Sequence, residues 1–93
     1  MREGPAYRRT TAALWRRVGG EVILTSPDGP EVDRLSLPAS ATWLLLDRSR
    51  TLGELTAALA DEFGEGRDEI APRVEEMVGE LVDRGWLVRA EAP

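Results

Sequence analysis

The sequence predicts an α+β fold, in which a three-stranded antiparallel sheet is followed by three helices and a short terminal strand in a winged-helix-like arrangement. Two observations predict it. Short apolar runs separated by glycine and proline turns fill residues 13–35, and apolar residues at helical spacing fill residues 36–84. A chain of 93 residues can bury one core, so we expect a single domain over residues 12–93. Residues 1–11 show no clean period and are expected to be a flexible N-terminal arm.

Three strands are predicted in the first third of the chain. Ala13–Val18 and Glu21–Thr25 flank two glycines, which favour a tight hairpin turn. Residues 27–30 read Pro-Asp-Gly-Pro, a strong turn because proline fixes φ and glycine accepts a positive φ. The third strand is therefore expected at Glu31–Leu35, at one edge of the sheet.

Three helices and a last strand are predicted after it. Ser36 can cap the first helix, whose run Trp43–Leu46 is apolar on nearly every side and should lie in the middle of the fold. Thr51 and Glu54 have the spacing of a capping box, which predicts a second helix over Leu52–Phe63. Apolar residues recur at helical spacing over Asp68–Arg84, and Gly85 then ends this third helix. Residues 86–88 are expected to form the final strand.

The composition argues against an enzyme. The chain has no histidine and no cysteine, so it lacks the usual general base near neutral pH, a thiolate nucleophile and the ligands typical of structural zinc. Neighbouring carboxylates such as Glu75 and Glu76 diverge on a helix and make poor acid–base pairs. We therefore expect no catalytic residue, no metal and no cofactor. The sequence has neither a signal-peptide pattern nor a run long enough to span a membrane, so a cytoplasmic protein with no membrane partner is expected.

Charge is unevenly distributed along the chain. The first 20 residues contain five arginines and one glutamate, whereas residues 51–93 contain eleven acidic residues and four arginines. An acidic helical half repels the phosphate backbone, so nucleic acid is not a favoured partner. A winged-helix DNA-binding protein whose basic arm contacts phosphate is the alternative function, and a purely structural subunit or a domain of a larger enzyme is a third possibility. No pattern indicates an oligomeric state.

Three segments resemble the PqqD family. They are Leu35–Asp47, which reads LSLPASATWLLLD, then Arg50–Leu55, and finally Leu81–Leu87. The resemblance covers about residues 20–88. It departs from the family pattern at Ser36, where asparagine is usual, and at Leu37 and Pro38, where the residues are usually small or polar. The resemblance implies a non-catalytic recognition element in the biosynthesis of ribosomally made, post-translationally modified peptides. Such a protein binds the leader segment of a precursor peptide and presents it to a separate modifying enzyme.

The resemblance also implies where the leader would bind, as an added strand beside the third strand and against the third helix. An open strand edge offers unpaired backbone groups to an extended peptide, which is compatible with this mode. The charges of that strand equally fit a plain solvated edge. On a helical wheel, Arg73 and Met77 border the apolar stripe of the third helix, although the border with Val78 and Val82 could serve instead. The candidate peptide-binding residues are Glu31, Val32, Asp33, Arg34 and Leu35 on the strand, with Arg73, Met77 and Glu80 as the wall and Ile70, Val74 and Leu81 as the floor on the helix.

Overall fold

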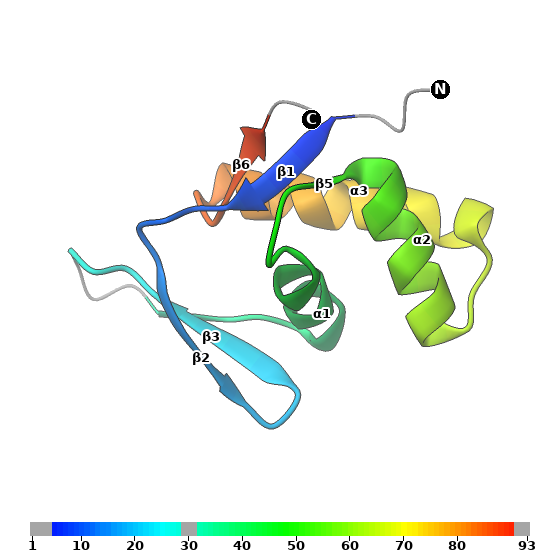
Figure 1. The fold of residues 1–93 in the computed structure, drawn as a ribbon. Coiled ribbons are helices and arrows are strands. Elements are labelled where there is room, and N and C mark those ends of the chain that lie inside the picture. The colour runs from blue at the N-terminus through cyan, green and yellow to red at the C-terminus, as the bar shows by residue number, and fades with distance from the viewer. Residues whose placement is uncertain (1–4, 29–31, 91–93) are drawn as a thin grey trace.

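The computed structural model describes residues 5–28 and 32–90, and the predicted α+β class is confirmed (Figure 1). A three-stranded antiparallel sheet, three helices and a terminal strand follow one another along the chain. Within the described ranges, no helix is long and apolar enough to cross a membrane. The elements are β1 (Ala6–Arg9), β2 (Leu14–Val18), β3 (Glu21–Thr25), β4 (Val32–Arg34), α1 (Leu37–Leu45), β5 (Arg50–Thr51), α2 (Leu52–Phe63), α3 (Arg67–Asp83) and β6 (Leu87–Ala90).

The predicted sheet has the strand order β2-β3-β4, so β4 lies at an edge. Strand β3 pairs antiparallel with β2, from Leu14↔Thr25 to Val18↔Glu21, and with β4, from Ile23↔Arg34 to Thr25↔Val32. The two-residue turn between β2 and β3 uses a positive φ of 63° at Gly19, a conformation that glycine adopts without strain. Glu31 and the second half of the predicted turn at 27–30 lie outside the described residues.

A second sheet replaces part of the expected N-terminal arm. Residues 1–4 lie outside the described residues, but Ala6–Arg9 form strand β1 at the centre of the order β5-β1-β6, so the prediction of a flexible arm is wrong for this segment. Its register with β6 runs from Ala6↔Ala90 to Arg9↔Leu87. Strand β1 therefore depends on partners at the far end of the chain, and local sequence carries little signal for such a pairing.

The predicted helix ends are confirmed by their capping contacts. Ser36 Oγ accepts a hydrogen bond of 3.3 Å from the Ala39 N–H at the start of α1. Thr51 and Glu54 form a capping box at the start of α2. Helix α3 ends before Gly85, whose φ of 86° lets the chain turn into β6.

The core surrounds α1, which contacts both β3 and α2 (Figure 1). Trp43 is buried at the centre of this cluster and Trp86 is buried near its border, as their apolar surroundings in the sequence predict. Residues Leu24, Leu55, Leu59 and Leu87, from the three elements β3, α2 and β6, complete the most buried part of the core. Helix α1 thereby links the β2-β3-β4 sheet to the helical half of the molecule.

One side chain of α1 holds the junction between β3 and β4. The fully buried Ser40 hydroxyl accepts a 2.8 Å hydrogen bond from the Val22 N–H and lies 3.2 Å from the Leu35 carbonyl oxygen, to which it donates. The Leu35 N–H in turn donates to the Val22 carbonyl at 2.9 Å. The serine hydroxyl thus satisfies one backbone donor on β3 and one backbone acceptor just after β4.

Replacing this serine is expected to destabilise the protein. In Ser40→Ala the Val22 N–H and the Leu35 carbonyl both lose their buried partner, which should cost about 1–3 kcal/mol in the free energy of unfolding. Urea denaturation followed by circular dichroism measures this loss. Thr11→Ala, at an exposed position, should change stability by less than about 0.5 kcal/mol. Equal stability of Ser40→Ala and the unsubstituted protein would contradict the bridging role.

Candidate functional site

Strand β4 has an open edge whose backbone groups point away from the sheet. Because the Leu35 N–H donates to Val22 on β3, the alternation of antiparallel strands makes Asp33 face β3 as well. The N–H and C=O groups of Val32 and Arg34 therefore face outward. Both side chains are exposed, and no further strand pairs with this edge within the described residues. An extended segment could pair with these four backbone groups.

Two adjoining hollows lie between this edge and the C-terminal half of α3. The first has a volume of about 270 Å³ and is lined by Arg34, Leu35, Ser36, Ala39, Met77, Glu80, Leu81 and Arg84. The second has a volume of about 330 Å³ and is lined by Val32, Asp33, Arg84 and Trp86. Arg84 lines both, so it stands at the boundary between them. We call the two hollows together the β4–α3 groove.

Asp33 fixes the distance between the two walls of the groove. Its Oδ2 accepts hydrogen bonds of 2.9 Å from Arg84 Nη1 and of 2.9 Å from Trp86 Nε1. The carboxylate is 23% exposed, so the ion pair with Arg84 is partly shielded from water. One side chain of β4 therefore joins the strand to the end of α3 and to the buried Trp86. The sequence predicts Asp33 as a peptide contact, and the structure gives it a bracing position at the groove.

Several predicted site residues meet in the groove. Val32, Asp33, Arg34 and Leu35 form its strand wall, and Met77, Glu80 and Leu81 form its helix wall. The border of α3 near Met77, rather than the one with Val78 and Val82, thus faces β4. Met77 is half-buried, with its sulfur 3.9 Å from the Thr42 hydroxyl.

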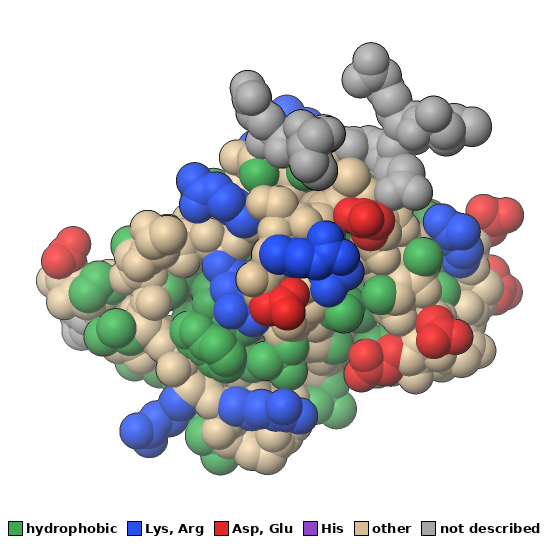
Figure 2. All heavy atoms as spheres, in the orientation of Figure 1, with side chains coloured by type: hydrophobic (Ala, Val, Ile, Leu, Met, Phe, Trp, Pro, Cys, Tyr) green, Lys and Arg blue, Asp and Glu red, His purple; other side chains and the backbone are tan. Residues whose placement is uncertain are grey.

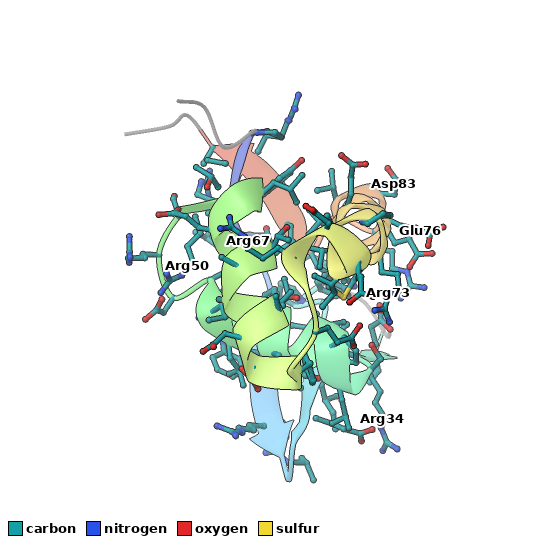
Figure 3. The ribbon with its side chains drawn as sticks, turned by 90° about the vertical axis from the view of Figure 1, so that its right-hand side faces the viewer. Arg34, Arg50, Arg67, Arg73, Glu76 and Asp83 are labelled. Carbon is teal, nitrogen blue, oxygen red and sulfur yellow. The ribbon has the colours of Figure 1, made fainter. Side chains whose placement is uncertain are left out.

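Three other predicted residues lie elsewhere. Ile70 and Val74 are buried in the core and do not line the hollows. Arg73 is exposed and forms an ion pair with Glu65, at the connection between α2 and α3. Figure 3 shows Arg73 and Arg34 on the same side of the molecule, from α3 and β4 respectively, both pointing outward. Arg73 lies about 6 Å along the helix from Met77, beyond the lined part of the groove.

The sequence reasoning missed Ser36, Ala39, Arg84 and Trp86 as groove residues, because it gave Ser36 only the role of a helix cap. Ala39 shows no local signal, because a small residue in a helix usually indicates only packing. Arg84 and Trp86 flank Gly85, whose position in the sequence predicts only that the third helix ends there. Only the approach of β4 to that end of α3 turns them into part of the groove.

The exposed surface of α3 is acidic. Its solvent-facing acids are Asp68, Glu69, Glu75, Glu76, Glu80 and Asp83, against the exposed Arg67 and Arg73. A helix that enters the major groove of DNA usually presents basic and amide side chains instead.

Comparison with protein families identifies one family whose sequence pattern this chain shares. The family described as "Coenzyme PQQ synthesis protein D (PqqD)" matches residues 21–87. The chain belongs to the PqqD family. The match covers β3, β4 and all three helices, and hence every element that lines the β4–α3 groove, whereas β1 and β2 precede it. No curated protein matches the chain significantly in sequence.

A solved structure shows the same fold. It is described as "TbiB1 in Complex with the TbiA(beta) Leader Peptide", and it superposes with a TM-score of 0.76 at 19% sequence identity. The similarity covers 86% of the present chain and 93% of that one. The PqqD-family architecture of this chain is thus shared with a protein whose sequence differs at most positions.

Removing the Asp33 carboxylate should loosen the groove. Asp33→Ala leaves the Trp86 Nε1–H without its acceptor and separates Arg84 from β4, so we expect a loss of about 1–3 kcal/mol in the free energy of unfolding. The matched control is Asp83→Ala, because Asp83 is exposed and makes no ion pair within the described part of the chain. Chemical denaturation of both variants compares them, and equal stabilities would contradict the bracing role of Asp33.

Proposed function

We propose that this protein captures the leader segment of a ribosomally made precursor peptide and presents it to a separate modifying enzyme, without catalysing the modification itself. The observation that carries this proposal is the open edge of β4 facing the lined hollows beside α3. Membership of the PqqD family supports it. The similar fold of TbiB1, described in complex with a leader peptide, supports it as well.

The leader binds as an additional strand at β4. Its backbone pairs with the outward N–H and C=O groups of Val32 and Arg34, which supply sequence-independent affinity. Alternate side chains of the bound strand point toward α3, because successive residues of a strand face opposite sides. They enter the two hollows, which sit on either side of Arg84.

The lining of the groove favours particular leader residues. The first hollow has an apolar lining of Leu35, Met77 and Leu81 that suits an apolar side chain, and methionine adapts its shape to different partners. Arg34 and Arg84 lie at its rim, where an acidic leader residue would form a charge-assisted hydrogen bond. Arg73 would contact the leader only where the peptide extends past Met77 along α3.

Removing an outward amide from β4 should abolish pairing without unfolding the sheet. Arg34→Pro eliminates an N–H that points away from β3, and proline is tolerated at sheet edges. We expect affinity for the leader peptide of its precursor to fall by more than about tenfold, or about 1.4 kcal/mol. Fluorescence anisotropy with a labelled leader measures the affinity, and far-UV circular dichroism checks the fold.

The matched control lies on the opposite edge of the same sheet. The register makes the Arg17 N–H on β2 point outward too, so Arg17→Pro removes the same group from the other edge. Unchanged affinity in Arg17→Pro and lost affinity in Arg34→Pro support pairing at β4. The reverse result moves the leader to β2, and a failure of the unsubstituted protein to bind its leader overturns the proposed function.

The helix wall is tested by a pair of truncations on α3. Met77 and Val82 are both half-buried and pack against the core, but only Met77 lines the groove. Met77→Ala and Val82→Ala should each cost about 1–2 kcal/mol in the free energy of unfolding. Only Met77→Ala should weaken leader binding, by about fivefold to tenfold, because it removes apolar contact with the peptide. Equal binding losses would mean that affinity follows stability rather than contact.

A further inference from the structure

A third hollow lies away from the groove, between β1, β2 and the C-terminal end of α1. Its volume is about 530 Å³, and its lining includes Arg8, Arg9, Trp15, Trp43, Asp47 and Arg48. Figure 2 shows an apolar patch on this face with arginine side chains around it. We call it the arginine–tryptophan hollow. It shares no lining residue with the β4–α3 groove, because the groove meets α1 at its N-terminal end.

Arg9 is held in this hollow without an acidic partner. Its Nε donates to the Trp43 carbonyl at 2.8 Å, and its guanidinium carbon lies 4.9 Å from the ring centre of Trp15 and 5.1 Å from that of Trp43. No carboxylate forms an ion pair with it among the described residues. Partial burial lowers the pKa of Arg9 from its usual value, although Asp47 acts in the opposite direction. A carboxylate brought into the hollow would favour the charged guanidinium.

Asp47 does not supply a carboxylate for an ion pair with Arg9, because it forms an ion pair of 3.5 Å with Arg50 instead. The surrounding surface is basic: residues 8–18 contain four arginines and no acidic residue, in a chain whose net charge is −5. A second copy that docked through the same face would bring the same arginines and be repelled, and nucleic acid would be repelled by the acidic remainder of the chain. Charge complementarity therefore favours an acidic protein segment.

Trp15 gives the hollow an anchoring surface. It is 42% exposed and packs edge-to-face on the buried Trp43, with ring centroids 6.0 Å apart. Its ring is therefore held in position while one side remains open to a partner. Tryptophan and arginine, the residues that dominate this hollow, are also those that contribute most to protein–protein affinity.

We propose that the arginine–tryptophan hollow is the docking site for an acidic segment of the modifying enzyme. This inference rests on the proposed function, since the partner is the enzyme that acts on the captured peptide. Because the hollow and the groove lie at opposite ends of α1 and share no residue, leader and enzyme bind at the same time. The protein then acts as an adaptor, with the leader on one side of α1 and the enzyme on the other.

The test reverses the two exposed arginines at the rim. In Arg8→Glu/Arg48→Glu the hollow repels an acidic segment, while Arg9 and its contacts with α1 stay in place. The control, Arg16→Glu/Arg89→Glu, makes the same change in net charge at exposed positions outside the hollow. Biolayer interferometry with the purified enzyme that modifies the precursor measures docking, first without precursor peptide. Leader affinity is measured separately by anisotropy.

We expect the rim variant to lose more than about tenfold in enzyme affinity and the control to stay within about twofold. Leader affinity should stay within about twofold in both variants, so failure of docking is distinguishable from failure of the proposed function. Docking should also weaken with added salt. Retained enzyme affinity in the rim variant overturns the inference, as does an equal loss in both variants or the absence of docking by the unsubstituted protein. A loss of leader affinity in the rim variant alone would assign the hollow to the leader and overturn it too.

Discussion

The register of β4 on β3 is the constraint on which the groove depends. The hydrogen bond from Leu35 to Val22 and the bridging hydroxyl of Ser40 fix that register from the core side. Shifting it by one residue would turn Val32 and Arg34 inward and move Asp33 away from Arg84 and Trp86, because strand faces alternate at every residue. The same small set of contacts therefore determines which amides face solvent and which side chain joins β4 to α3.

Helix α1 carries this constraint to the rest of the molecule. Near its N-terminus, Ser36 and Ala39 line the groove, and Ser40 holds the junction of β3 and β4. At its C-terminus, Arg9 donates to the Trp43 carbonyl, which also accepts a hydrogen bond from the Leu46 N–H at the end of the helix. A nine-residue helix is thus fastened to a different sheet at each end. This arrangement gives a small protein two separate surfaces without a second domain.

The prediction of the groove from the sequence was partial for a physical reason. A helical wheel identifies both borders of the apolar stripe on α3 but contains no information about what packs against either one. Met77 and Glu80 lie on the border that faces β4, whereas Arg73, on the same border, pairs with Glu65 in the connection between α2 and α3. Arg84 and Trp86 became groove residues only through the approach of Asp33, which is 51 residues from Arg84 in the chain.

The sequence by itself determined the helices, the β2–β3 hairpin and the position of β4, because caps, turns and apolar periodicity act over a few residues. Thr51 with Glu54, Gly19 and Gly85 are such local signals, and the structure confirms each of them. Only the tertiary structure decided that Ala6–Arg9 pair with β6, that the C-terminal end of α3 lies beside the open edge of β4, and that Arg9 lies over the rings of two tryptophans. Each of these requires residues far apart in sequence to meet, and their encounter depends on the packing of the whole core rather than on local preference.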